Sequence, residues 1–504
     1  MPNPIAYLAL LLWPLAIWVM FRKMPLERAF IWAILGGYMV LPELTEFNLP
    51  MIPPLDKASI PNLTAAFICI ALLKLRPALL PAGMLGKALV LMLIAAPVIS
   101  VFQNLEPITF AMQHSGQLIV QPFPLSSIDQ GAGVPSSVPG MRMYDAFSAL
   151  AQQLILILPF FLARHILASE AALGELLRAL VIAGLIYSAP ILFEARFSPQ
   201  LHTWIYGFFQ HDFIQMIRQG GFRPIVFMPH GLWLALFMVM TAIAALHFAL
   251  QAAPEKRPRA ILIAFWLLGM VVLTRSVGPL VLLAVAGASL LLFAPRMQFR
   301  LAAAMAGVAI SYPLLRGGGL IPTEQLVSFV RDRSPDRAQS LEFRFDNEDM
   351  LLERASEKPF FGWGGWGRNQ VFDPDTGEVL SVSDGMWIIT IGQWGWLGYL
   401  AMFGLLCLPL LALWWRYRLV ANRDIPPAAG VLALILGISL IDLLPNATMV
   451  PLTWLIAGAL LGHAELQHRR AQQARLQRWR DQPSRAGLMT GARSAAPDFK
   501  HSFL

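Results

Sequence analysis

Long apolar runs, rather than amphipathic stripes, dominate the chain. Segments such as 261–273 and 281–293 have no polar face to turn toward water, and a helix that is apolar all round is buried in protein or in lipid. Runs that approach about 20 residues favour lipid, so the pattern predicts an all-α polytopic membrane protein with about thirteen transmembrane helices. These helices are expected near 5–21, 28–42, 61–75, 86–102, 145–164, 172–192, 229–250, 260–274, 277–294, 300–315, 385–415, 428–443 and 447–463.

The composition supports this prediction. Hydrophobic residues make up 57% of the 504 residues and charged residues only 13%, whereas a soluble domain is about 45–50% apolar and about 25% charged. Both cysteines, Cys69 and Cys407, lie inside apolar runs, which leaves no disulfide framework or thiolate metal site. The first apolar run has no basic residue ahead of it and is expected to be a retained helix rather than a signal peptide.

Basic residues alternate between successive loops and predict the orientation in the membrane. Lys and Arg gather in every second loop, as in Arg22 and Lys23, and again in the segment 469–500, whereas the intervening short loops carry acids such as Glu43 and Asp56. The positive-inside rule then places the N-terminus in the periplasm and the C-terminus in the cytoplasm of a bacterial inner-membrane protein. The net charge of +8 is therefore mainly a topology signal, and no nucleic-acid partner is expected.

The predicted helices and loops define four parts. Residues 1–315 hold the first ten helices with outer loops at 103–143 and 194–228, residues 316–384 form a large periplasmic loop with short helices, residues 385–463 hold the last helices, and 464–504 form a basic cytoplasmic tail. Loops this long are usually functional or disordered, and 359–368 is too aromatic for a disordered linker. Its tryptophans fit either ligand stacking or an interfacial anchor.

Several polar residues are predicted to meet at the outer ends of helices: Arg223, His230, Arg275, Asp384 and Asp442. An arginine in a short turn between spans is a functional candidate that suits a diphosphate. Each has a simpler interpretation. Arg275 fits a snorkelling side chain, Asp384 a helix N-cap and His230 a structural interface residue. No metal or nucleotide motif is present, so no cofactor is expected, and a lipid-linked donor would supply any transfer reaction.

Four stretches resemble the O-antigen ligase and Wzy-type polymerase superfamily of bacterial membrane glycosyltransferases. They are Gly221-Phe-Arg-Pro-Ile-Val-Phe-Met-Pro-His-Gly231, Leu273-Thr-Arg-Ser-Val-Gly-Pro279, the stretch from Arg344 to Glu357-Lys-Pro-Phe-Phe-Gly-Trp-Gly364, and Ser383-Asp-Gly-Met-Trp-Ile-Ile-Thr-Ile-Gly-Gln-Trp-Gly-Trp-Leu-Gly398. The resemblance covers about 215–400 in motif detail and the rest only in hydropathy. The family usually has His where this chain has Asp384, and usually one helix fewer.

The resemblance implies a metal-independent, inverting transfer of a glycan from an undecaprenyl-diphosphate carrier. The implied catalytic residues are Asp384, Arg275 and Arg223, and the implied substrate-binding residues are Arg218, His230, Arg344, Trp363, Trp366 and Arg368. Asp384 would be the base, with His230 as the alternative.

The resemblance leaves the acceptor open. A polymerase for an exopolysaccharide or O-antigen is favoured, and a ligase to lipid A-core or to another acceptor is the alternative. A flippase, which would carry charges deep in its spans, and a non-catalytic assembly subunit are rivals of other classes. The expected partners are the carrier-linked glycan, membrane lipids and other polysaccharide-assembly proteins.

Overall fold

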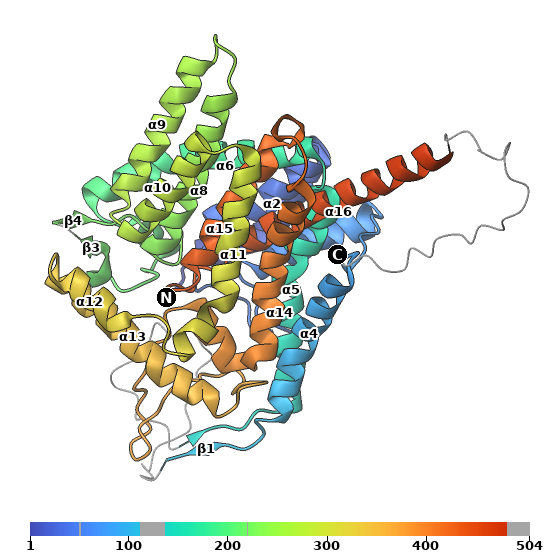
Figure 1. The fold of residues 1–504 in the computed structure, drawn as a ribbon. Helices are drawn as coiled ribbons and strands as arrows, with labels where there is room; N and C mark the ends of the chain where they lie inside the picture. The colour runs from blue at the N-terminus through green and yellow to red at the C-terminus, as the bar shows by residue number, and fades with distance from the viewer. Residues whose placement is uncertain (50–51, 111–136, 219, 481–504) are drawn as a thin grey trace, which may run out of the picture.

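Each apolar run predicted to cross the membrane forms a helix in the computed structural model, which describes residues 1–49, 52–110, 137–218 and 220–480 (Figure 1). The corresponding helices are α1 (Pro4–Lys23), α2 (Leu26–Val40), α3 (Ser59–Phe67) with the π-helical turn η1 (Ile68–Leu72), α4 (Met84–Phe102), α5 (Met143–Ile166), α6 (Glu170–Phe197), α8 (Gly231–Gln251), α9 (Arg257–Leu273), α10 (Val277–Leu292), α11 (Pro295–Gly317), α14 (Met386–Tyr417), α15 (Pro427–Asp442) and α16 (Pro451–Arg480).

Among the described residues, seven helices are long and apolar enough to cross a membrane: α1, α4, α5, α6, α8, α11 and α14. Large apolar side chains such as Leu11, Phe265 and Leu292 are more than half exposed on the helices, which suits contact with lipid rather than water. The fold class is therefore all-α with membrane-spanning helices, and the larger number of about thirteen spans stays a prediction.

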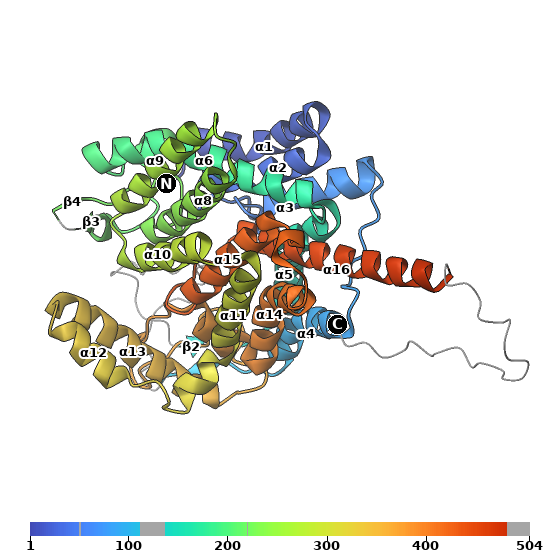
Figure 2. The same ribbon diagram turned by 45° about the horizontal axis from the view of Figure 1, so that its top comes forward.

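The helices pack closely where glycines remove the side chain. α16 lies beside α5, and α14 beside α4 (Figures 1 and 2). A Cβ added at Gly458 or Gly462 of α16 would lie 2.2 Å from the carbonyl oxygen of Phe160 or 2.1 Å from that of Arg164, both on α5. Small residues four apart let two helix backbones approach in this way.

Short elements fill the long predicted loops. The segment before α8 holds α7 (Leu201–Tyr206), η2 (Ile214–Met216) and the hairpin of β3 (Ile217–Arg218) and β4 (Gly221–Phe222). The segment before α14 holds α12 (Thr323–Arg331) and α13 (Pro335–Ser356), and α13 contains the amphipathic stretch 341–355. The helices α12 and α13 lie toward the same end of the helical body as the hairpin of β1 (Ile108–Thr109) and β2 (Ser137–Val138) (Figure 1). Residues 111–136 of the loop predicted at 103–143 lie outside the described residues.

The last helix is longer than predicted. α16 continues past 463 to Arg480, because 464–480 is rich in Ala, Leu, Gln and Arg, which are strong helix formers. The first part of the predicted cytoplasmic tail is thus helical, and 481–504 lies outside the described residues. A single 3₁₀ turn, η3 (Asn422–Asp424), connects α14 and α15.

Candidate functional site

A buried glutamate at the end of α6 holds the segment that carries Arg223. Glu194 is fully buried, and its Oε2 accepts hydrogen bonds from the backbone nitrogens of Ile225, at 2.9 Å, and Val226, at 2.7 Å. Its Oε1 accepts a third from Leu201, at 3.1 Å. Val226 has a φ of +55°, a conformation that costs energy in a β-branched residue and persists only when its surroundings impose it. Glu194 therefore fixes the course of the chain between Arg223 and α8.

Arg223 is a buried cation with no acidic partner among the residues that the structure describes. Its Nη2 donates to the hydroxyl of Ser276, at 2.6 Å, and its Nε has no hydrogen-bond partner in this part of the chain. Its side chain crosses the first turn of α8, where a Cβ added at Gly231 would lie 2.5 Å from Nε. Burial, and then the positive charge of Arg218, lowers the pKa of Arg223 to about 10, and no acidic group of the described residues offsets this. A buried guanidinium that still has an unused N–H donor is suited to binding an anionic ligand.

His230 lies beside Arg223 and remains neutral. It is the N-cap of α8, and its Nδ1 accepts a hydrogen bond from the backbone nitrogen of Leu232, at 3.2 Å. The proton of the neutral ring is then on Nε2, which is buried and has no hydrogen-bond partner within the described ranges. Burial first, and then the charge of Arg223 with those of His211, Arg218 and Arg344, lowers the pKa of His230 to about 2. In this tautomer His230 donates a hydrogen bond to a ligand, which favours a role other than the base.

Arg275 supports the hairpin that carries Arg218. It occupies the turn between α9 and α10 with a φ of +51°, and its Nη1 donates to the backbone oxygen of Arg218, at 2.7 Å. A Cβ added at Gly221 would lie 2.3 Å from its Nη2, so only a glycine lets the hairpin lie on the guanidinium. The exposed Arg218 and the turn of Arg275 are thus brought together, next to the Ser276 hydroxyl that Arg223 binds.

Asp384 forms an ion pair with Arg344, the residue of α13 whose charge also acts on His230. Arg344 Nε lies 3.3 Å from Asp384 Oδ2, and Arg344 Nη1 donates to the backbone oxygen of Pro445, at 3.4 Å. The N-cap residue of α14 is Gly385, with no side-chain hydrogen bond, so Asp384 is not the helix cap. Its carboxylate is 41% exposed, which keeps it accessible to a substrate hydroxyl.

Asp442 has a structural role at the end of α15. Its two carboxylate oxygens accept from the side chains of Asn446, at 3.1 Å, and Thr448, at 2.6 Å. These bonds fix the turn from which Pro445 contacts Arg344.

Trp363, Trp366 and Arg368 lie with the β1–β2 end of the long loop rather than with Arg223. Two cations contact the ring of Trp363, with Arg354 Cζ 3.3 Å and Lys358 Nζ 4.3 Å from its centroid. The indole of Trp366 donates to Asp145, at 3.2 Å. Arg368 is 2% exposed and donates to the backbone oxygens of Pro139, at 2.7 Å, and Glu106, at 2.9 Å. Their contacts tie two loops together, and substrate binding by them stays a prediction.

Two groups of residues therefore make up the site. Contacts bring Arg218, Arg223, His230 and Arg275 together, and the Arg344–Asp384 ion pair is linked to them through the charge of Arg344, which acts on His230. Two neighbours of these residues were not singled out in the sequence. Ser276 lies inside a motif that was already singled out, and His211, whose ring centroid is 4.5 Å from that of His230, follows an aromatic run without a signal of its own. Glu194 had a usable signal, since a lone acid at the end of an apolar helix is a functional candidate. Within the described residues no group of three or more His, Cys, Asp or Glu could hold a metal ion.

No protein-family model and no curated protein matches this chain.

Replacing Glu194 by alanine is expected to lower the free energy of unfolding by about 3 kcal/mol or more, because hydrogen bonds to a charged group are worth about 1.5–3 kcal/mol each. Thermal unfolding of the purified protein in detergent measures this. Glu170→Ala, which removes an exposed acid from the first turn of the same helix, is the matched control. Equal melting of the two variants would show that Glu194 does not hold the segment.

Proposed function

We propose that the protein is a membrane glycosyltransferase that polymerises oligosaccharide repeat units carried on undecaprenyl diphosphate, on the periplasmic face of a bacterial inner membrane. The observation that carries this proposal is Arg223, a buried guanidinium with no acidic partner among the described residues, next to the unpartnered Nε2–H of His230. Two donors of this kind that lack acceptors favour an anion with several oxygens. The polyprenyl diphosphate of a lipid-linked sugar is such an anion, and apolar helices surround the site.

In the proposed topology the chain crosses the membrane about thirteen times, with its N-terminus outside. The ends of α6, α9 and α15 and the starts of α8, α10, α14 and α16 then face the periplasm together with α12 and α13. The site residues belong to these ends and to the loops between them. The resemblance to the ligase and polymerase superfamily agrees with this location of the site.

The proposed reaction is an inverting displacement. The acceptor hydroxyl attacks the anomeric carbon of the donor, its proton passes to the carboxylate of Asp384, and the bond from that carbon to the diphosphate oxygen breaks. Undecaprenyl diphosphate leaves with the electron pair. Arg223 and Arg275 stabilise the charge that develops on the leaving oxygen, and His230 donates a hydrogen bond to it. Arg344 orients Asp384 through their ion pair.

A deletion strain complemented with wild type, Arg275→Ala or Asp384→Asn tests the proposal. Removing a group that stabilises the developing charge, as in Arg275→Ala, is expected to lower transfer about 100–1,000-fold. Removing the general base, as in Asp384→Asn, is expected to lower it about 100–10,000-fold, so both variants should make no long polymer at equal expression. Carrier-linked and surface glycans are extracted and sized. Arg300→Ala, an exposed arginine of α11, is the control with normal polymer.

The sizes distinguish the alternatives. Single repeat units that accumulate on the carrier mean a polymerase. Long carrier-linked chains that never reach an acceptor mean a ligase, the alternative function. Wild-type polymer from Arg275→Ala and Asp384→Asn would refute catalysis at this site.

A further inference from the structure

A cavity with both polar and apolar lining adjoins the segment that carries Arg223 and His230. It has a volume of about 140 Å³ and is lined by residues from the outer end of α2, the start of α3, the start of α8 and the start of α16, among them Tyr38, Trp233 and Met449. Pro229, the neighbour of His230, forms part of its wall. A closed apolar cavity of about 150 Å³ admits benzene. This cavity is of similar volume and partly open, so it can take one six-membered ring whose substituents project from the opening.

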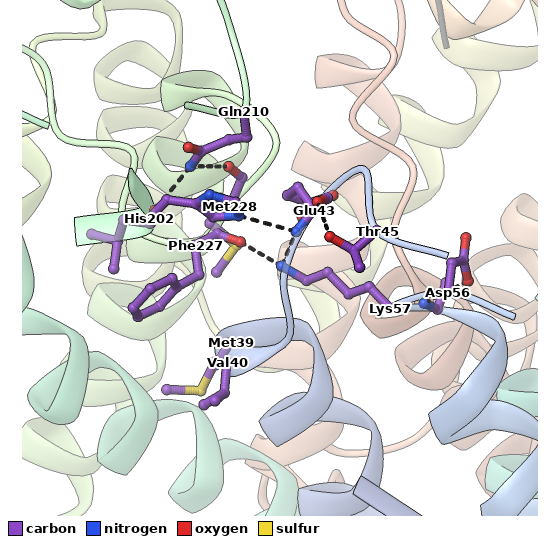
Figure 3. A network of polar contacts seen from close by, with 12 residues as sticks. Met39, Val40, Glu43, Thr45, Asp56, Lys57, His202, Gln210, Phe227 and Met228 are labelled. Carbon is purple, nitrogen blue, oxygen red and sulfur yellow. Dashed lines mark hydrogen bonds and ion pairs between the residues drawn. The ribbon is translucent and has the colours of Figure 1, made fainter. Parts of the chain in front are cut away.

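A buried ion pair supplies charge to the cavity. Lys57 Nζ lies 2.7 Å from Glu43 Oε1 and also donates to the backbone oxygen of Phe227 (Figure 3). Burial raises the pKa of Glu43 and lowers that of Lys57 more than the two charges offset. An ammonium has three N–H donors, so the third N–H of Lys57 remains for another acceptor.

The ion pair is held in place by the neighbouring loop. The backbone nitrogen of Glu43 donates to Nε2 of His202, at 3.2 Å (Figure 3). The Nδ1 of the same ring lies 2.8 Å from the backbone oxygen of Phe208, at hydrogen-bond distance. Thr45 donates to the backbone oxygen of Glu43, at 3.1 Å. The loop between α2 and α3 is thereby fastened to the segment before α8, which makes the cavity a preformed site.

Asn62 offers a hydrogen-bond acceptor at the cavity. It lines the cavity with 1% exposure, and its Nδ2 donates to the backbone oxygen of Ile155, at 3.0 Å, while no described residue donates to its Oδ1. A buried acceptor without a hydrogen bond is costly. A ligand with a hydroxyl group would satisfy it.

The lining matches a sugar better than an ion. The carboxylates of Glu43 and Asp56 disfavour an anion, and the ammonium of Lys57 disfavours a metal cation. One donor, several acceptors and the apolar faces of Tyr38 and Trp233 suit a ring with hydroxyl groups at its edge and C–H groups on its face. We infer that this cavity binds a single pyranose ring. Its role as the subsite for the acceptor's terminal sugar rests on the proposed function, and the binding itself does not.

Saturation-transfer NMR on the full chain in lipid nanodiscs tests the inference. The probes are the methyl glycosides of glucose, mannose, rhamnose, N-acetylglucosamine and glucuronic acid. At least one should receive saturation from wild type, and this signal should be lost in Ala58→Phe, which fills the cavity without removing a polar group, and in Asn62→Leu. Ala294→Phe, at the N-cap of α11 and away from the cavity lining, should keep it.

Each outcome decides the matter. Absence of signal for every glycoside with wild type, or signal that persists in both cavity variants, would overturn the inference and leave a cavity that holds water. Two different variants are used because Asn62→Leu also removes the bond to Ile155. If the protein bound a sugar but had no transfer activity, only the proposed function would be refuted. If it transferred glycan but bound no sugar in the cavity, only the inference of a sugar-binding cavity would be refuted.

Discussion

Alanine in place of Gly231 is expected to lower glycan transfer about 100-fold without removing any functional group, because a displacement of about 1 Å in a reacting site costs about that much. The added Cβ would lie 2.5 Å from Nε and 2.7 Å from Cδ of Arg223. The helix backbone of α8 accepts alanine better than glycine, so the flexible arginine side chain moves instead. The fold is retained while the guanidinium leaves its place beside Ser276 and His230.

Gly278→Ala is the matched control for this prediction. Gly278 also lies in the first turn of a helix at the site, α10, and an added Cβ there would have no atom of the described residues within 4 Å. Transfer by the two variants is compared at equal expression, with the length of carrier-linked glycan as the measure. If Gly231→Ala made polymer as well as Gly278→Ala, the position of Arg223 would not matter to transfer, and the diphosphate-binding role would be lost.

The helices could be predicted because apolar runs need only their own composition to indicate burial. All the predicted segments are helical in the structure, and the differences concern their ends, most clearly at α16. The polarity that would end a span at 463 does not end the helix, since Arg, Gln and Ala continue a helix in water as well as in lipid. The end of an apolar run therefore predicts where a helix leaves the membrane, but not where the helix itself ends.

Most residues of the candidate site were singled out in the sequence, but Ser276, His211 and the contacts among these residues were not. Arg223, Arg275 and Asp384 carried a signal because charges at the ends of apolar helices are rare. The protonation of His230 depends on a bond between its Nδ1 and the backbone of Leu232, which no residue pattern reveals. The ion pair of Lys57 and Glu43 joins two loop charges fourteen positions apart. It depends on the loop folding back on itself, which the sequence does not indicate.

The glycine-rich stretch 359–368 has a structural role that the sequence did not reveal. Glycine lets a backbone approach another group closely, and here the glycines let the long loop approach α14. Gly362 has a φ of +69°, and a Cβ there would lie 2.5 Å from the backbone carbon of Gln393. The backbone nitrogens of Trp363 and Gly364 donate to the oxygens of Gly392, at 2.8 Å, and Gln393, at 2.9 Å. The motif is therefore a joint between the long loop and a break in the helix.

Gly395→Ala is expected to lower the free energy of unfolding by about 3 kcal/mol or more, since a residue forced into a glycine-only conformation costs about 1–3 kcal/mol before any clash is counted. Gly395 breaks α14 with φ 62° and ψ −166°. A Cβ there would lie 2.3 Å from the backbone carbon of Phe360 and 2.4 Å from the nitrogen of Phe361. Backbone atoms cannot move aside as a side chain does, so the joint must open.

Separating the long loop from α14 has a second consequence. It leaves two backbone N–H groups of α14 without the loop carbonyl oxygens that accept their hydrogen bonds. The nitrogens of Trp396 and Leu397 donate to the oxygens of Pro359, at 2.8 Å, and Phe360, at 3.1 Å, instead of to the preceding turn of α14. Thermal unfolding in detergent measures the loss. Gly269→Ala is the control, since a Cβ added at this position within α9 would have no described atom within 4 Å, and it should melt like wild type. Equal melting of Gly395→Ala and Gly269→Ala would show that the contact between the long loop and Gly395 does not stabilise the fold.

Because this contact also sets α13 against the start of α14, Gly395→Ala should separate Arg344 from Asp384. Glycan transfer should then stop even in the fraction of the protein that stays folded.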